Sequence, residues 1–244
     1  MITSARNARV KKWKKLHHRK TRYEWKQFLI EGFHLLEEAL KSGWGIKEII
    51  KVQGVTIPEQ YNLYNITEVS SPVFNQIAQT ESPQGIIAVV EMKKPSSLSG
   101  SHIMMIDAIQ DPGNLGTIIR TADAAGYNAV VLGDGTVDIY NDKVIRATQG
   151  SIFHIPIISA NLRNCIDRLQ INHFKVITSA LKESVPYQSI DKPEKVALIV
   201  GNEGNGIDEA ILSSADMNVH IPIYGDAESL NVSVAAGILM YHFR

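Results

Sequence analysis

Two polar side chains, Asn114 and Arg120, follow an apolar strand and are the first candidates for chemistry. The strand ends at Ile106, and a Pro-Gly turn then opens a helix whose apolar residues recur at helical spacing up to the stop at Gly126. Open α/β sheets bind their ligands at the carboxyl ends of their strands. An amide and a guanidinium there could orient a polar substrate, although a helix cap and a solvated charge would produce the same pattern.

Two later segments carry polar residues at equivalent positions. In the first, a strand ends at Gly201, and Asn202 and Glu203 follow within a glycine-rich turn. In the second, a short strand leads through a loop into a terminal helix, for which Ser229 is the expected cap and Asn231 lies in the first turn. Three loops can therefore form one site. The sequence has neither a Walker lysine nor a Gly-x-Gly-x-x-Gly after a strand, which argues against a phosphate-cradling nucleotide site.

The three loops together resemble a known enzyme family. The order and the residue types of the three segments resemble the three motifs of the SpoU (TrmH-type) RNA ribose 2′-O-methyltransferases of the SPOUT superfamily. The segments are Asn114…Arg120, Gly201-Asn202-Glu203-Gly204 and Ser229-Leu230-Asn231. This resemblance covers residues 101 to 244. Upstream, Phe28–Ala39 resembles the small substrate-binding domain that precedes many such enzymes.

The resemblance implies transfer of a methyl group from S-adenosyl-L-methionine to a ribose 2′-hydroxyl, and we favour ribosomal RNA as the substrate. The catalytic residues that it implies are Asn114, Arg120, Glu203, Ser229 and Asn231. The cofactor-binding residues that it implies are Thr178, Ser179, Ala180, Gly201, Asn202, Ile221 and Leu230. Because a guanidinium stays protonated, a charged clamp on the adjacent phosphate is the favoured role for the arginine, and a role as proton acceptor stays open.

Several alternatives remain at this stage. The substrate could be transfer RNA, or the chain could be a non-catalytic RNA-binding factor on the same fold. An NAD-dependent oxidoreductase is disfavoured because the glycine fingerprint is missing after the first strand. At the residue level, Asn114 and Ser229 could be helix caps only, and Arg120 could pair with Asp123 on the helix surface.

The formal net charge of zero hides a strong asymmetry. Residues 1–26 hold ten Lys or Arg against the single acid Glu24, a local charge of +9, so the remainder carries −9. Such a cluster is typical of nucleic-acid binding through phosphates. The predicted RNA-binding residues are Arg6, Arg9, Lys11, Lys12, Lys14, Lys15, Arg19, Lys20 and Arg22. The residues interleaved with them, which could stack on bases, are Trp13, His17, His18 and Tyr23.

The pattern of strands and helices along the sequence predicts an α/β protein with two domains. We predict a small α/β substrate-binding domain with a basic N-terminal arm for residues 1–95. A Ser/Pro/Gly linker is expected at 96–100, and the methyltransferase domain at 101–244. In the latter, strands near 102–107, 129–132, 155–158, 175–180, 196–201 and 219–223 alternate with helices, which predicts a mostly parallel, helix-covered sheet. The resemblance adds a C-terminal trefoil knot, which periodicity does not show.

Further properties concern partners and location. The final helix is apolar on almost every face, so the knot or a partner subunit must cover it, and the resemblance implies a homodimer through the catalytic domain. The single Cys165 excludes an internal disulfide, and the histidines lack metal-ligand spacing, so no metal is expected. No apolar run is long enough to span a membrane, and no signal peptide is visible, so we expect a cytoplasmic protein.

Overall fold

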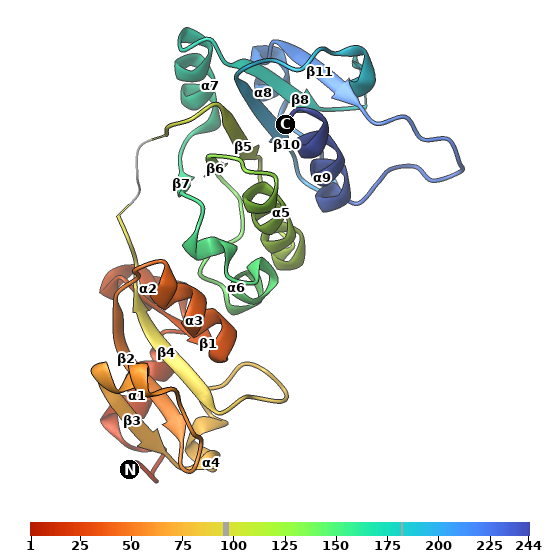
Figure 1. The fold of residues 1–244 in the computed structure, drawn as a ribbon. Helices are drawn as coiled ribbons and strands as arrows, with labels where there is room; N and C mark the ends of the chain where they lie inside the picture. Colours follow the sequence, from red (N-terminus) through yellow and green to blue (C-terminus); the bar gives the residue numbers. More distant parts are fainter. Residues whose placement is uncertain (95–97, 182) are drawn as a thin grey trace. The chain divides into compact units, whose positions relative to one another are not determined.

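The computed structural model describes residues 1–94, 98–181 and 183–244. The chain forms two compact units, one of Met1–Lys94 with Asp138–Phe153 and the other of Pro95–Val137 with His154–Arg244 (Figure 1). The predicted linker 96–100 lies partly outside the described residues. The units differ from the predicted domains in one segment, residues 138–153, which pack with the N-terminal residues. None of the helices in the described ranges has the length and hydrophobicity needed to cross a membrane.

The N-terminal unit is built on a four-stranded mixed sheet with the order β1-β4-β2-β3. Strand β4 pairs antiparallel with β1 and β2, and β2 pairs parallel with β3. The strands are β1 Gln27–Glu31, β2 Ile46–Val52, β3 Ile66–Val69 and β4 Ile86–Glu91. The helices are α1 Ala8–Lys15, α2 Arg19–Trp25, α3 Phe33–Lys41, α4 Ser71–Phe74 and α6 Asp142–Thr148, with short 3-10 turns at Glu59–Leu63 and Ser151–Phe153.

The basic N-terminal segment is folded into helices α1 and α2. Asn7 caps α1 by accepting a hydrogen bond from the Arg9 backbone amide at 2.8 Å. The apolar face of α1 packs into the core of the N-terminal unit, where Val10 and Trp13 are at most 2% exposed. The expectation that Trp13 stacks on RNA bases is therefore wrong, since its ring is buried and its indole N–H donates to Glu48 at 3.1 Å.

Residues 138–153 belong to the N-terminal unit because buried polar contacts hold them there. The Arg22 guanidinium ion-pairs with Asp138, and both side chains are at most 7% exposed. The Tyr23 hydroxyl donates a hydrogen bond of 2.9 Å to the same carboxylate. At the other end of the segment, the Trp44 indole donates to the Phe153 carbonyl at 3.1 Å. The chain thus leaves the C-terminal unit between two of its strands to complete the core of the N-terminal unit.

The C-terminal unit is a seven-stranded sheet with the order β7-β6-β5-β10-β8-β11-β9, and all of its strand pairs are parallel. The strands are β5 His102–Ile106, β6 Ala129–Leu132, β7 Ile157–Ser159, β8 Lys175–Ser179, β9 Val185–Pro186, β10 Val196–Val200 and β11 Met217–His220. The six predicted strands are present with small shifts at their ends. The sequence did not indicate β9, a two-residue edge strand too short to carry an alternating pattern.

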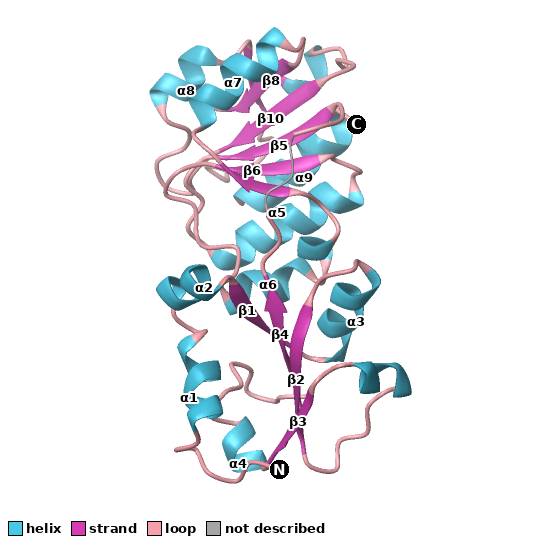
Figure 2. Cartoon of the chain, turned by 90° about the vertical axis from the view of Figure 1, so that its left-hand side faces the viewer, coloured by secondary structure: helices cyan, strands magenta, loops and turns pink. Residues whose placement is uncertain are grey.

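Helices cover both faces of this sheet (Figure 2). They are α5 Pro112–Ala124, α7 Leu162–Ile171, α8 Glu209–Ser214 and α9 Val232–His242, with a 3-10 turn at Tyr187–Ser189. One face of β5 and β10 packs with α7 and α8, and includes Ile103, Met105 and Ile199. Helix α9 packs against α5 and β10 on the other face. This parallel, helix-covered arrangement confirms the predicted fold class.

Candidate active site

The Asn114 side chain joins all three motif loops. Its Nδ2 donates a hydrogen bond of 3.0 Å to Glu203 Oε1 in the loop after β10. Its Oδ1 accepts a hydrogen bond of 3.0 Å from Asn231 Nδ2 at the start of α9. Asn114 is not the helix cap that the simpler alternative required, because Asp111 caps α5 by accepting from the Asn114 backbone amide at 2.7 Å. Its amide is therefore available to connect the loops.

The Glu203 carboxylate is surrounded by hydrogen-bond donors. Besides Asn114, the backbone amides of Gln110 and Asp111 point at it, at 3.5 and 3.4 Å. Partial burial works against ionisation, but these hydrogen bonds outweigh it and lower the pKa of Glu203 below its ordinary value of 4.5. Among the described residues, the Glu203 side chain has no hydrogen bond or ion pair with Arg120, and its hydrogen bonds go to the β5–α5 loop.

Further contacts tie the second loop to the first. The Asn202 amide donates to the Ala108 carbonyl at 2.8 Å, and its Oδ1 accepts from the Gly204 and Asn205 amides at 2.9 and 3.0 Å. Ala108 has a φ of +52°, a left-handed conformation uncommon for a residue with a side chain. The buried Asp107 carboxylate accepts from the Asp208 amide at 2.8 Å. Together these contacts hold both ends of the glycine-rich loop against the end of β5.

Glycine is required in this loop for two different reasons. A Cβ on Gly201 would lie 2.5 Å from the Gly206 carbonyl oxygen, which no side chain tolerates. Gly206 has a φ of +73°, in the left-handed region that favours glycine. The backbones of Asn202 and Gly206 then pair in both directions, at 2.9 and 3.0 Å. The sequence predicts a tight turn here. The close approach of the Gly206 carbonyl to Gly201 explains why the strand must end in glycine.

The sequence analysis missed Asp107, Ala108 and Asp111. Asp111 had a recognisable signal, because Asp followed by Pro is a common N-cap and N1 pair. Asp107 and Ala108 had none, since their roles depend on residues about a hundred positions away. Burial raises the pKa of Asp107, and the amide of Asp208 partly offsets that effect.

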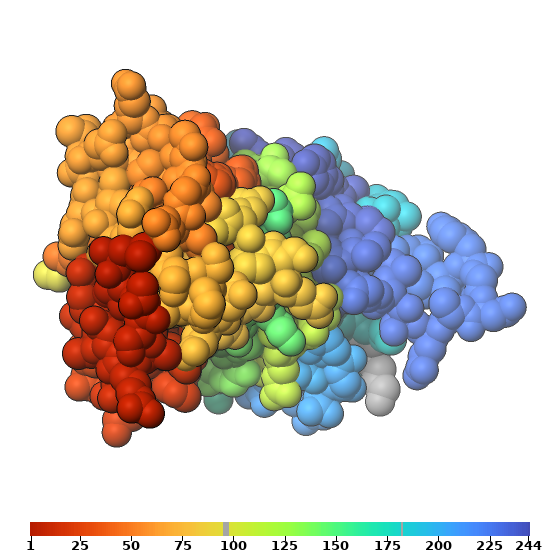
Figure 3. Space-filling view, turned by 90° about the horizontal axis from the view of Figure 1, so that it is seen from below, coloured from red at the N-terminus to blue at the C-terminus, as the bar shows by residue number. Residues whose placement is uncertain are grey.

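The expected cap of the last helix is corrected by the structure. Asn231 caps α9, with its Oδ1 accepting from the Ser233 and Val234 amides at 2.9 and 3.4 Å. Ser229 lies outside the helix and is exposed, so it is not the cap. Ser229 belongs to the loop between β11 and α9, which extends from its sheet in Figure 1 and protrudes in Figure 3. The structure therefore brings Asn231, but not Ser229, into the hydrogen-bonded cluster.

Arg120 lies on α5, six residues beyond Asn114, or about 9 Å along the helix axis. Its side chain is exposed, and within the described part of the chain it has no hydrogen bond or ion pair. The alternative that it pairs with Asp123 is not observed, because the Asp123 carboxylate accepts from His154 Nδ1 at 2.9 Å. The structure thus leaves the guanidinium available to a ligand without placing it in the cluster.

The residues expected to bind the cofactor lie near the carboxyl ends of adjacent strands. Thr178 and Ser179 end β8 and Ala180 follows it, Gly201 and Asn202 follow β10, and Ile221 follows β11. Thr178 is fully buried and its hydroxyl donates to Asn218, so its side chain is already bonded within the sheet. Leu230 is 36% exposed and offers an apolar surface. An apolar surface without a phosphate cradle suits a nucleoside such as S-adenosyl-L-methionine.

The predicted RNA-binding residues fall into three groups in the structure. Those with exposed side chains are Arg6, Lys11, Lys12, Lys14, Lys15, Arg19 and Lys20. Arg9 is about half exposed and also contacts Glu48 and Thr67. Arg22 is buried, and besides its ion pair it donates to the carbonyls of Leu16 and His17 at 3.0 and 2.7 Å. Including Arg22 among the RNA contacts was wrong, because its charge is neutralised inside the protein.

Comparison with known proteins decides the family. Residues 101–241 match the SpoU rRNA Methylase family. The chain belongs to the SpoU rRNA methylase family. This confirms the recognition made from the three motifs and identifies the chain as a methyltransferase. Residues 7–88 match the MRM3-like substrate binding domain, which agrees with the resemblance seen in the N-terminal unit. Membership in this family also implies the trefoil knot.

Individual relatives extend the match over the whole chain. The chain is 50% identical, over all of its own length and 98% of the relative's, to the 23S rRNA (guanosine(2553)-2′-O)-methyltransferase RlmP of Bacillus subtilis (strain 168). A crystal structure of an AdoMet-bound rRNA methyltransferase from Sinorhizobium meliloti is 34% identical, with a TM-score of 0.89 and coverage of 100% and 96%. A crystal structure of an RNA 2′-O ribose methyltransferase is 32% identical, with a TM-score of 0.85 and coverage of 98% and 96%.

Proposed function

We propose that this SpoU-family methyltransferase transfers the methyl group of S-adenosyl-L-methionine to a ribose 2′-hydroxyl of 23S ribosomal RNA. The observation that carries the proposal is the hydrogen-bonded chain Glu203–Asn114–Asn231, which unites the three motif loops beside the carboxyl ends of β5 and β10. The guanosine named for the Bacillus subtilis relative is the first candidate nucleotide, since that relative matches the chain end to end.

The chemistry requires few protein groups. When bound, S-adenosyl-L-methionine supplies an already activated methyl group. The protein has to hold the ribose in line with it and assist loss of the hydroxyl proton. In our proposal Arg120 clamps the phosphate next to the target ribose and stabilises the developing charge on the oxygen. Glu203 and Asn114 keep the β5–α5 loop in place, and Asn231, Ser229 and Leu230 line the third loop. The strand ends of β8, β10 and β11 hold the cofactor.

Substitution of Arg120 tests this mechanism. We expect Arg120→Lys to reduce single-turnover methylation of unmodified 23S rRNA strongly, because it retains the charge and loses the planar fork. Arg120→Ala should reduce it further, by roughly 10²–10³-fold. Cofactor affinity, measured by calorimetry, should hardly change in either variant. Arg163→Ala, at an exposed arginine of α7, is the matched control. Near wild-type turnover in Arg120→Ala would remove this residue from the mechanism.

The substrate assignment has its own test. Mapping of 2′-O-methylation in ribosomal RNA from cells that lack the gene should show the loss of one methyl group. A loss in transfer RNA instead would support the alternative substrate, and binding of RNA without methylation of any RNA would support the non-catalytic alternative. Since ribosomal RNA is made in the cytoplasm of bacteria such as the relative's source, we also propose a cytoplasmic location.

We further propose that the enzyme is a homodimer through its catalytic unit. Helix α9 buries Ala236, Leu239 and Met240 but leaves Val234 and Tyr241, both apolar or aromatic, 51% and 59% exposed. A second copy would cover this face. Val234→Glu should therefore shift the sedimentation coefficient of the purified protein from dimer to monomer. Ile171→Glu, at an exposed apolar residue of α7, should leave the dimer intact. A wild-type monomer at micromolar concentration would contradict the proposal.

A further inference from the structure

Ser233, in the first turn of α9, joins the hydrogen-bonded cluster of the site through its side chain. Its hydroxyl donates a hydrogen bond of 2.6 Å to Asn231 Oδ1. The same oxygen accepts the backbone amides of Ser233 and Val234, at 2.9 and 3.4 Å. Those amides are what a helix cap has to bind, so the hydroxyl bond is additional to the cap. The mechanism proposed for methyl transfer gives Ser233 no role.

The hydrogen bonds of the cluster run in one direction, which is set by Glu203. With its pKa lowered, the Glu203 carboxylate is ionised at neutral pH and can only accept. Asn114 must therefore turn its Nδ2 toward Glu203, at 3.0 Å, which leaves its Oδ1 for Asn231. Asn231 must in turn give its Nδ2 to Asn114, at 3.0 Å. The Oδ1 of Asn231 then faces the start of α9.

The other end of the chain enforces the same orientation, because three donors meet at Asn231 Oδ1. Two of them are backbone amides held by the helix, and the third is the Ser233 hydroxyl. If the Asn231 amide rotated by half a turn, its NH₂ group would face these donors and its oxygen would face the Asn114 oxygen. Both contacts would leave polar groups without partners. The short bond from Ser233 therefore stabilises the orientation that the site requires.

The consequence of this bond extends to the β5–α5 loop. Asn231 holds Asn114, which holds Glu203, and the Glu203 carboxylate accepts the backbone amides of Gln110 and Asp111. Helix α5 begins directly after this loop. Hydrogen bonds in a connected chain polarise one another, so the loss of one weakens the next. The Ser233 hydroxyl thus acts on the loop without contacting it.

We propose that Ser233 is a positioning residue for methyl transfer, whose hydroxyl fixes the Asn231 amide and thereby the hydrogen-bonded chain that unites the three motif loops. The inference rests on the proposed function, because it gives a part in that reaction to a residue outside the three motif segments. It predicts an effect on the rate of transfer and little effect on the binding of cofactor or RNA.

Kinetics of the full-length enzyme with unmodified 23S rRNA test this role. Ser233→Ala should lower kcat roughly five- to tenfold, the equivalent of one hydrogen bond, and leave the KM for RNA and the cofactor affinity within about twofold. Ser233→Thr keeps the hydroxyl and should recover most of kcat. The matched control is Ser214→Ala, at a half-buried helical serine whose hydroxyl donates at 2.6 Å to the Ala210 carbonyl of α8. The control should leave kcat unchanged.

A double substitution separates positioning through Asn231 from a general loss of packing. Asn231→Asp retains an oxygen that caps α9 but cannot donate to Asn114, so it breaks the chain while the helix still begins at the same residue. In that background Ser233→Ala should cause no further loss of kcat. An equal loss in both backgrounds, or wild-type kcat in Ser233→Ala alone, would overturn the proposal.

NMR of the full-length protein with isotope-labelled asparagine provides a measurement that needs no substrate. The side-chain NH₂ signals of Asn114, which has no direct bond to Ser233, should shift in Ser233→Ala and stay in place in Ser214→Ala. If the wild type methylates no RNA but these signals shift, the proposed function fails and the positioning by Ser233 stands. Unchanged Asn114 signals would overturn the inference even if kcat fell.

Discussion

Asn114 is the side chain on which the geometry of the site depends most directly, because it is both donor and acceptor between loops. It bonds Glu203 and Asn231, which lie 89 and 117 positions away along the chain. An aspartate at this position could not donate to Glu203 and would place two carboxylates together. An amide is therefore needed for this bridge, independently of any contact with substrate.

The ionisation of Glu203 predicts how the stability of the protein depends on pH. Since its pKa is lower in the folded protein than in the unfolded chain, the unfolded state binds more protons in the interval between the two values. The contribution of Glu203 to stability is thus fully present above 4.5, its ordinary value, and is lost as the pH falls through the folded value. Urea unfolding of wild type and Glu203→Gln over a pH series should show a difference that is largest near neutrality and closes below pH 4.5. A difference in unfolding free energy that increased at acidic pH would contradict the predicted direction. Glu209→Gln, at an exposed glutamate of the neighbouring helix, is the control.

Helix α1 combines a buried apolar face with an exposed basic face, and the exposed basic residues continue into α2. Val10, Trp13 and Leu16 lie in the core of the N-terminal unit, while the lysines point to solvent. Deleting residues 1–26 would therefore remove core residues together with the charges. Weaker RNA binding after such a deletion would not distinguish the loss of the folded core from the loss of positive charge. Neutralising the exposed lysines separates the two effects.

We expect the triple variant Lys14→Gln, Lys15→Gln, Lys20→Gln to bind 23S rRNA more weakly, with a shallower dependence of log K on log salt. Each lost phosphate contact should reduce the slope by about 0.7–0.9. The melting temperature and cofactor affinity should stay close to those of the wild type, because these side chains are exposed. The same change at three other exposed lysines, Lys41, Lys47 and Lys143, is the control. Equal slopes for both triple variants would mean that the α1–α2 face is not the RNA contact.

Across the whole molecule, the two units are not two consecutive stretches of chain. Segment Asp138–Phe153 lies between β6 and β7 of the C-terminal unit in sequence, yet it completes the N-terminal core. It supplies the carboxylate that neutralises the buried Arg22 guanidinium. Removing one member of a buried ion pair typically costs about 3–5 kcal/mol, since the other charge stays buried without compensation. A fragment of residues 1–95 lacks Asp138 and would lose this ion pair.

A fragment of residues 1–95 is therefore expected to be poorly folded, although it includes all of residues 7–88, which match the substrate-binding family. Its amide NMR spectrum should lack the dispersion that the same residues show in the full chain. Arg22→Gln in the fragment should partly restore order, because it removes the uncompensated charge, whereas in the full chain the same substitution should lower stability. A well-dispersed spectrum of the unmodified fragment would show that residues 138–153 are dispensable for this core.

The sequence alone determined the family, the fold class and the three motif loops. These features are local: an apolar run marks a buried strand, helical spacing marks a covering helix, and each motif is read within about ten residues. For this reason six of the seven strands of the large sheet, the helix after Asp111 and the glycine-rich turn at Gly201 were predicted correctly. The same local patterns indicate Asn114, Glu203 and Asn231 as candidate residues.

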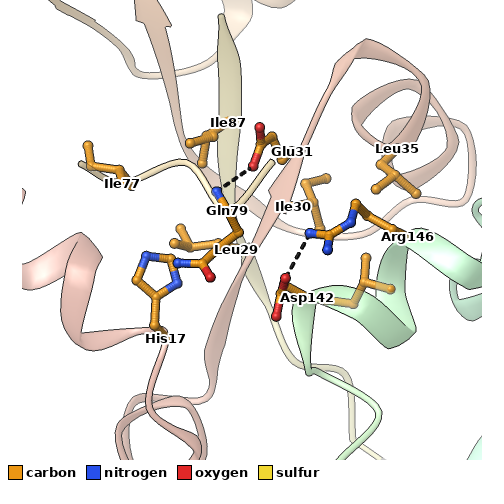
Figure 4. Close-up of a pocket in the computed structure, with 11 residues that line it drawn as sticks. His17, Leu29, Ile30, Glu31, Leu35, Ile77, Gln79, Ile87, Asp142 and Arg146 are labelled. Atoms are coloured by element: carbon orange, nitrogen blue, oxygen red, sulfur yellow. Dashed lines mark hydrogen bonds and ion pairs between the residues drawn. The ribbon is translucent and has the colours of Figure 1, made fainter. Parts of the chain in front are cut away.

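The remaining features depend on residues that meet only after folding. Ser229 and Asn231 both belong to residue types that cap helices well. Helix α9 begins directly after Asn231, so Asn231 is the cap. Arg22 resembles its exposed basic neighbours in sequence, but it is buried because Asp138, 116 positions away, packs beside it. The hollow beside His17 (Figure 4) likewise requires the turn between α1 and α2, strand β1 and helix α6 to come together. Burial and long-range pairing of charges follow from packing, which a linear pattern of residue types does not encode.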